Sequence, residues 1–145
     1  LVIPYKALIG GDERKVLEYV KASKEACGTQ AQLKVIIESG ELNDDLIATA
    51  TKQAIDGGAN FVKTSTGKVA VNATLAATDI MLNTIKASGK KVGFKAAGGV
   101  RTVTDAAEYL ALAESIMGEA YLQPELFRFG ASGLLKDVYV TLNES

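Results

Sequence analysis

Three lysines at a regular spacing are the residues best able to carry out chemistry. Lys34, Lys63 and Lys95 each lie six residues after a glycine that ends an expected helix, at positions 28, 57 and 89. This spacing predicts that the three amines stand at an equivalent depth in three successive parallel strands. One mid-strand lysine would be explained as protection of a sheet edge, but three consecutive interior strands cannot all be edges. We therefore expect the lysine side chains to point to the axis of a barrel.

Clustered, desolvated lysines favour Schiff-base chemistry. Burial and a neighbouring ammonium both disfavour the charged form of a lysine, and burial alone can lower its pKa to about 5–6. The neutral amine is a nucleophile toward carbonyl carbons, so one lysine can form an imine while a second holds its pKa down. Glu38, on the same strand face as Lys34, could stabilise the cluster or carry protons. The pattern predicts the metal-free chemistry of a class I aldolase.

Glycine-rich loops after the expected strands predict a phosphate site beside the lysines. Glycine lets backbone N–H groups approach an anion, and the N-terminus of the following helix adds partial positive charge. In a βα barrel, phosphate is commonly held by the loops after the last two strands. Val62 and Val69 stand where a Walker A loop needs glycine and Ser or Thr, so that motif is excluded. The loops are residues 66–68, 98–101 and 130–133, and Lys68 and Arg101 add full positive charge to them.

The composition excludes several other kinds of site. The 145 residues include no histidine and one cysteine, Cys27. Serine–histidine and cysteine–histidine nucleophiles and the HExxH zinc site are therefore absent, and we expect neither a metal nor a cofactor. The net charge of −1, with no basic run and no long apolar run, argues against nucleic acid or a membrane as partner. A lone thiol fits a reducing, cytoplasmic setting.

The elements that must position these residues alternate between strand and helix. Five strands are expected, at residues 1–5, 33–38, 61–66, 92–96 and 126–129. Five helices are expected, at about residues 12–27, 43–56, 73–88, 102–117 and 134–142, with Thr102 or Thr104 capping the fourth. Such alternation implies parallel strands joined by right-handed crossovers. We expect one α/β domain over residues 1–145, in the form of a partial (β/α)8 TIM barrel.

Four motifs in the chain resemble those of the deoxyribose-phosphate aldolase family. They are KTSTGKVAVNAT at 63–74, VGFKAAGGVR at 92–101, LKVIIE at 33–38 and RFGAS at 128–132. Together they follow the family's order over essentially the whole chain, and the first two are highly specific. The resemblance implies a cofactor-free class I lyase that cleaves 2-deoxy-D-ribose 5-phosphate to D-glyceraldehyde 3-phosphate and acetaldehyde.

The resemblance also assigns roles to individual residues. It implies that Lys63 forms the Schiff base, that Lys95 tunes the reactivity of Lys63, and that Lys34 belongs to a proton-relay network. The resemblance implies seven phosphate-binding residues, which are Gly67, Lys68, Gly98, Gly99, Arg101, Gly130 and Ser132. Gly133 stands where some members have a serine, so one side-chain contact to phosphate is lost here.

The resemblance covers only part of the family's eight-stranded barrel. The chain corresponds to strands four to eight and begins mid-strand at Leu1, without methionine, as a fragment would. The family's catalytic aspartate would lie one residue before Leu1. One interpretation is an aldolase domain, and the alternative is a catalytically impaired barrel fragment that folds and self-associates without turnover. The lysine cluster argues against a different phosphate-binding barrel, such as an isomerase or a metal-dependent aldolase.

An open parallel sheet also predicts self-association. Parallel sheets are normally covered on both faces, and a five-stranded partial barrel leaves two edges and the inner face around Ile36 and Phe61 uncovered. We therefore expect a homo-oligomer, most simply a dimer that pairs the open faces. A phosphorylated sugar is the expected small-molecule partner.

Overall fold

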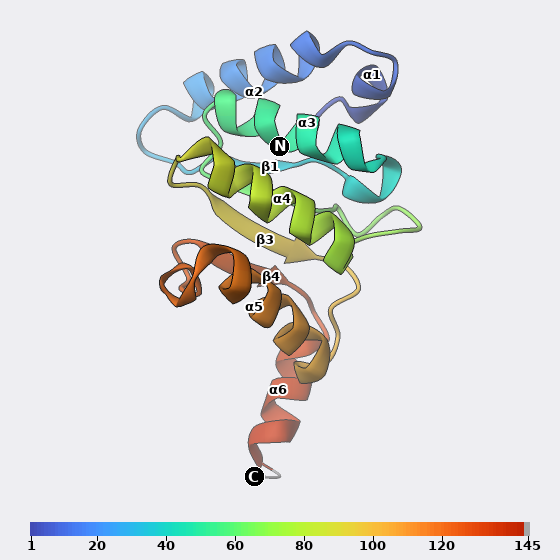
Figure 1. The fold of residues 1–145 in the computed structure, drawn as a ribbon, viewed down its shortest axis with the longest axis vertical. Helices are drawn as coiled ribbons and strands as arrows, with labels where there is room; N and C mark the ends of the chain where they lie inside the picture. The colour runs from blue at the N-terminus through green and yellow to red at the C-terminus, as the bar shows by residue number, and fades with distance from the viewer. Residues whose placement is uncertain (144–145) are drawn as a thin grey trace.

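Helices and strands alternate along the described part of the chain, residues 1–143 of a computed structural model (Figure 1). The strands are β1 (Lys34–Ile36), β2 (Phe61–Lys63), β3 (Gly93–Ala97) and β4 (Phe127–Gly130). The α-helices are α1 (Tyr5–Ile9), α2 (Glu13–Cys27), α3 (Asp44–Asp56), α4 (Leu75–Ser88), α5 (Val103–Met117) and α6 (Leu134–Asn143). Two short 3₁₀-helices are η1 (Ser39–Glu41) and η2 (Glu119–Tyr121).

The strands form one parallel sheet in the order β1-β2-β3-β4. Sequential strands are neighbours, and a helix connects each to the next, as expected for a βα repeat. Figure 1 shows α2, α3, α4 and α5 stacked one after another along the sheet, with α6 extending away at the C-terminal end. The expected α/β alternation is confirmed, with four strands in the described residues rather than five.

The expected strand at residues 1–5 is reduced to one bridge. Val2 pairs with Ile36 in an isolated parallel bridge, and the backbone groups of Leu1 and Ile3 hydrogen-bond those of Ile36. Pro4 has no N–H group with which to continue a ladder, and it stands instead at the N-cap of α1. The prediction of a full strand is therefore wrong in extent, although the segment does lie beside β1.

The first two strands are also shorter than predicted. Each is three residues long, because the chain turns soon after it. Glu38 takes a left-handed conformation, with φ 58°, at the start of η1. After β2, the backbone N–H of Thr64 still donates to the carbonyl of Lys95 at 3.1 Å, and the Thr64 hydroxyl then continues the contact with β3. Its Oγ1 accepts from the N–H of Ala97 and donates to the carbonyl of the same residue.

The core lies between the sheet and its helices. The strand side chains that alternate with the lysines, such as Val35, Val62 and Phe94, are fully buried. They belong to one apolar cluster with helix residues such as Ala50 and Met81. This arrangement confirms the prediction that this face of the sheet meets the helices. Within residues 1–143, no helix is both long and apolar enough to cross a membrane.

Side-chain caps begin the longer helices much as the sequence predicts. Asp12 and Asn43 accept a hydrogen bond from the N–H three residues later, at the starts of α2 and α3. Thr102, not Thr104, caps α5 and forms a capping box with Asp105. Thr74 caps α4, which therefore starts slightly later than predicted. These caps fix where each helix begins, and so where each loop after a strand must end.

Candidate active site

Lys63 and Lys95 stand side by side in the sheet. The register of β2 and β3 places Lys63 opposite Lys95. In β1, however, Lys34 pairs with Phe61, and Ile36 is the residue that pairs with Lys63. The prediction of equal depth is confirmed for Lys63 and Lys95 and wrong for Lys34, which lies two residues nearer the start of the sheet. Spacing from a glycine counts residues along the chain, whereas register depends on the stagger between strands.

The three lysines are half-buried, because they point to the face of the sheet that carries no helices. The pKa of Lys63 is lowered, first by burial and then by the charge of Lys95, whereas Glu38 opposes the shift. The pKa of Lys34 is also lowered, by burial first and then by neighbouring cations, Lys95 foremost. The amine of Lys63 is therefore more easily deprotonated than that of a free lysine, as nucleophilic attack requires.

Arg128 is a fourth cation on this face, and the sequence reasoning missed it as a site residue. It pairs with Lys95 in the register of β3 and β4, and its Cζ lies 4.4 Å from the ring centroid of Phe61. Lys34 Nζ lies 5.2 Å from the same centroid. The two cations cover the ring, which is only 1% exposed, in cation–π geometry. The alternation along β4, in which buried Phe127 precedes Arg128, is the signal that could have identified this residue.

A cavity of about 420 Å³ opens at the carboxyl ends of β2, β3 and β4. Lys63 lines it together with loop residues 66–67, 97–101 and 130–133. Six of the seven expected phosphate-binding residues line this cavity, and Lys68, which is exposed, does not. Lys34 and Lys95 are also outside the lining, but Lys95 is close: a Cβ on Gly130 would lie 2.7 Å from Lys95 Cε. The fold thus brings Lys63 and the glycine-rich loops together.

The N-terminus of α5 offers fewer free donors than the sequence led us to expect. Asp105 Oδ2 accepts from the backbone N–H groups of Arg101 and Thr102 at 2.9 and 3.0 Å. Asp137 Oδ2 accepts from the first N–H of the helix at 2.7 Å. Gly98 and Gly99 have φ of 82° and 92°. The N–H of Gly98 donates to the carbonyl of Gly130 at 3.4 Å, so the exposed Gly99 is the part of this loop that is open to an anion. The left-handed conformation of both glycines, which other residues rarely adopt, shapes this part of the cavity wall.

The described residues show no metal centre in this region. No group of three or more His, Cys, Asp or Glu side chains within residues 1–143 is arranged to hold a metal ion. The polar groups that the described residues do bring to this region are amines, a guanidinium group, hydroxyls, backbone N–H groups and the Glu38 carboxylate.

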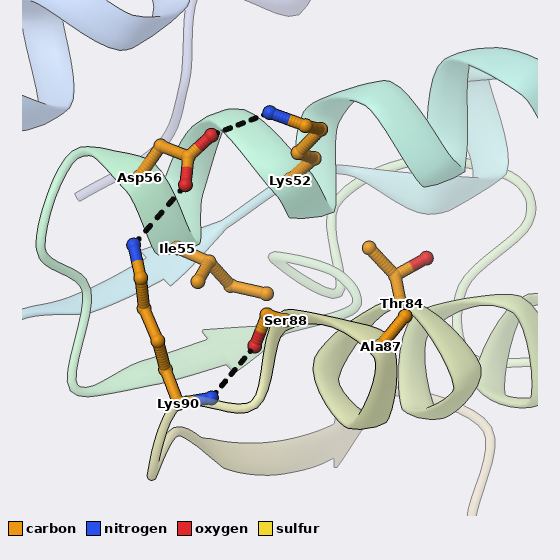
Figure 2. Close-up of a pocket in the computed structure, with 7 residues that line it drawn as sticks. All are labelled: Lys52, Ile55, Asp56, Thr84, Ala87, Ser88 and Lys90. Carbon is orange, nitrogen blue, oxygen red and sulfur yellow. Dashed lines mark hydrogen bonds and ion pairs between the residues drawn. The ribbon is translucent and has the colours of Figure 1, made fainter.

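A smaller hollow of about 190 Å³ lies between the C-terminal parts of α3 and α4 (Figure 2). Asp56 there bridges Lys52 and Lys90 at 2.6 and 3.1 Å. The hydrogen bond from Lys52 is the largest cause that lowers the pKa of Asp56, and the hydrogen bond from Lys90 is the next. Because α3 ends just before β2 begins, the hollow lies at the end of the sheet opposite the Lys63 cavity. Its lysines are exposed and paired with a carboxylate, so they are poor candidates for Schiff-base chemistry.

Sequence comparison places the chain among aldolases. Residues 1–136 match the sequence profile of the DeoC/LacD family of aldolases. The chain is 58% identical over 139 residues to the deoxyribose-phosphate aldolase of Agrobacterium fabrum (strain C58 / ATCC 33970). That alignment covers 95% of this chain and 54% of the Agrobacterium protein. The chain thus spans about half the length of the curated relative that it matches.

Solved structures show the same partial coverage. A candidate deoxyribose-phosphate aldolase from Coccidioides immitis superposes with a TM-score of 0.83 at 28% identity, over 97% of this chain and 51% of that one. The apo form of another, from Toxoplasma gondii ME49, superposes with a TM-score of 0.90 at 25% identity. That superposition covers 99% of this chain and 58% of the Toxoplasma chain. The four parallel strands and their helices therefore match about half of a deoxyribose-phosphate aldolase barrel.

Proposed function

The chain belongs to the DeoC/LacD family of aldolases, and we propose that it carries the Schiff-base site of a class I aldolase acting on 2-deoxy-D-ribose 5-phosphate. The products would be D-glyceraldehyde 3-phosphate and acetaldehyde. The observation that carries the proposal is the position of Lys63, which lines the loop cavity and pairs with Lys95. The choice of substrate rests on the similarity to the Agrobacterium aldolase.

In this reaction the amine of Lys63 attacks the C1 aldehyde of the open-chain sugar, and loss of water gives an iminium ion. The C2–C3 bond then breaks, and its electron pair moves toward the iminium nitrogen to give an enamine. At the same time the C3 hydroxyl loses its proton and becomes the aldehyde of glyceraldehyde 3-phosphate. Protonation of the enamine carbon and hydrolysis of the resulting imine release acetaldehyde and the free amine.

The other site residues support this step in distinct ways. Lys95 disfavours the ammonium form of Lys63 and so keeps the nucleophile available. Lys34, further down the same face, would take part in proton relay. The 5-phosphate would be held by the loops that line the cavity, with Arg101 supplying positive charge. No cofactor is required, because the iminium ion itself is the electron sink.

A second candidate function is a barrel fragment that folds and self-associates without turnover. The carboxylate that acts on Lys63 is that of Glu38, and both of its oxygens accept hydrogen bonds from Thr66. A carboxylate bound in this way is poorly placed to take the proton of the C3 hydroxyl. General acid–base help contributes about 10²–10⁴-fold, so imine formation with no measurable turnover would favour this alternative.

Borohydride reduction in the presence of acetaldehyde tests the proposed nucleophile. Reduction of the imine should leave an ethyl group on Lys63, located by peptide mass spectrometry, and Lys63→Leu should abolish that adduct. The control is Lys52→Leu, which removes an exposed lysine far from the cavity and should leave the adduct intact. Absence of any adduct on Lys63 of the unaltered chain would refute imine chemistry, and sugar-phosphate cleavage measured in parallel separates the two candidate functions.

We also propose a homo-oligomer and a cytoplasmic setting. The inner face of the sheet, which holds the half-buried lysines, has no helix layer over it in the described residues. Pairing this face with that of a second copy would cover it. The cytoplasmic proposal rests on the single cysteine and on the sugar-phosphate substrate.

A further inference from the structure

Glu38 is a buried carboxylate to which the reaction described above gives no role. The residue follows β1 and is only 2% exposed. Within residues 1–143 it is also the one non-glycine residue with a positive φ, 58°. A left-handed conformation is unfavourable for a residue with a Cβ, so contacts elsewhere must compensate for it. Burial and backbone strain together indicate that this side chain has a specific task.

The contacts of Glu38 converge on Thr66, in the loop after β2. Oε1 accepts from the backbone N–H of Thr66 at 3.0 Å, and Oε2 accepts from its hydroxyl at 2.6 Å. The same hydroxyl oxygen accepts from the backbone N–H of Lys68 at 3.1 Å. The carboxylate therefore holds Thr66 by two hydrogen bonds, and the Thr66 hydroxyl in turn closes the turn to Lys68. Hydrogen bonds to an ionised acceptor are the stronger kind, and burial protects them from competing water.

A second contact joins the same two segments. Gly40, two residues after Glu38, packs against the loop so closely that a Cβ on it would lie 1.9 Å from the carbonyl oxygen of Val71. The turn after β1 thus touches the loop after β2 at both ends, near Thr66 and near Val71. Such a double attachment leaves the loop little freedom to shift.

The loop that Glu38 holds is the one that connects the nucleophile to the phosphate cavity. Thr66 and Gly67 line the cavity, and Thr66 lies three residues after Lys63. A substrate that reacts at C1 while its phosphate sits at C5 needs a fixed distance between the amine and the phosphate site. We propose that Glu38 is a positioning residue that sets this distance through Thr66, without touching the substrate. The inference rests on the proposed function, which supplies the phosphorylated substrate.

Glu38→Gln tests the proposal with little change of shape. A glutamine can still accept one hydrogen bond, but its NH₂ group is a donor and cannot accept the proton of the Thr66 hydroxyl. The turn should loosen, while Lys63 and Lys95 stay in the sheet. Loss of the Glu38 charge removes an effect that raises the pKa of Lys63, so imine trapping with acetaldehyde, which has no phosphate, should stay the same or become faster. The preference for 2-deoxyribose 5-phosphate over 2-deoxyribose in the same assay should fall about tenfold, as loss of a charge-assisted hydrogen bond predicts.

Three controls separate positioning from a general loss of structure. Ser39→Ala alters the neighbouring buried side chain, whose hydroxyl has no partner among the described residues, and should leave the preference unchanged. Glu38→Asp keeps the charge but has a shorter side chain. Its preference for the sugar phosphate should lie between that of Glu38→Gln and that of the unaltered chain. In a Thr66→Val background, Glu38→Gln should have a much smaller effect, because the residue through which it acts is already altered.

The outcomes are distinguishable from failure of the proposed function. If the unaltered chain traps no acetaldehyde, the imine proposal fails, and the positioning role is tested by calorimetric titration with inorganic phosphate, which Glu38→Gln should weaken about tenfold. Equal loss of trapping with acetaldehyde and with the sugar phosphate would overturn the inference in favour of a merely structural role. An unchanged preference for the sugar phosphate in Glu38→Gln would also overturn it. So would a double variant in which the effects of Glu38→Gln and Thr66→Val simply add. Should Glu38→Gln fail to fold, Glu38→Asp provides the same comparison.

Discussion

At the scale of single residues, the reactivity of Lys63 depends on what surrounds one amine. Burial lowers its pKa most, and the Lys95 ammonium lowers it further, while the Glu38 carboxylate raises it. The register that sets Lys63 opposite Lys95 makes the second effect a direct one. Because Glu38 is bound to Thr66 by both oxygens, its charge is held in place and cannot swing onto Lys63 as a close ion pair. The balance of these effects therefore leaves the pKa of Lys63 below that of a free lysine.

Replacement of Lys95 should move the pH dependence of imine formation upward. In Lys95→Leu a positive charge that disfavours the Lys63 ammonium is gone, so the pKa of Lys63 should rise and less free amine should be present at neutral pH. Trapping of acetaldehyde should be several-fold slower near pH 7 and should recover at alkaline pH. Lys95→Arg, which keeps the charge, should leave the profile in place. Superimposable pH profiles for Lys95→Leu and the unaltered chain would show that Lys95 does not tune the nucleophile.

At the scale of elements, the register between strands also decides how the inner face packs. β2 and β3 pair Phe61 with Gly93, and the Phe61 ring lies over the glycine. An added Cβ on Gly93 would lie 2.4 Å from a ring carbon of Phe61. The missing side chain is therefore a packing requirement of these two strands. The Phe61 ring, in turn, makes cation–π contacts with Lys34 and Arg128.

Gly93→Ala should accordingly destabilise the fold. Overpacking of a well-filled site typically costs about 1–3 kcal/mol, and urea unfolding should show a loss in this range. Gly133→Ala is the matched control, since an added Cβ there has no atom within 4 Å and the residue has no positive φ. Phe61→Leu introduced beside Gly93→Ala should recover part of the loss by making room. A destabilisation no larger than that of Gly133→Ala would mean that the strands separate to accept the methyl group.

At the scale of the whole molecule, the open inner face carries a concentrated positive charge. Its cations are Lys34, Lys63, Lys95 and Arg128. The Glu38 carboxylate beside them is engaged with Thr66. The Phe61 ring, which was expected to be uncovered, is only 1% exposed because Lys34 and Arg128 lie over it. Covering this face with an identical copy would bury the half-exposed Ile36 but would also bring like charges together. Hydrophobic and electrostatic terms therefore oppose each other in the proposed dimer.

The proposed dimer should therefore tighten as salt is added. Screening lengths fall from about 10 Å at 0.1 M salt to about 3 Å at 1 M, which weakens repulsion between the facing cations while the apolar contact persists. Sedimentation velocity at micromolar concentration should show more dimer at high NaCl, and Arg128→Gln should raise the dimer fraction at low salt. A compact monomer under all these conditions would rule out pairing of the open faces. Weaker association at high salt would indicate an interface held by ion pairs on another surface.

Much of the fold could be predicted from the sequence because it depends on local signals. Asp12, Asn43 and Thr102 cap their helices, as short polar residues before an apolar helical pattern indicate. The side chains that alternate with the lysines were expected against the helices, where Val35 and Val62 are now buried. The glycine-rich loops were expected to meet at one end of the sheet, and six of their seven named residues line one cavity there. The ends of the strands were less predictable, because Pro4 and the left-handed Glu38 stop pairing that the apolar pattern would allow.

By itself, then, the sequence determined the alternation of elements, the presence of residue types able to form an imine, and the end of the sheet at which the glycine-rich loops meet. Only the tertiary structure decided how these residues meet. It set Lys34 two residues away from the level of Lys63 and placed Arg128 beside Lys95. It also turned Glu38 toward Thr66, 28 residues later in the chain. The physical reason is that stagger between strands and contacts between distant loops arise from packing across the whole sheet. Such packing produces no periodic pattern in the sequence of any one segment.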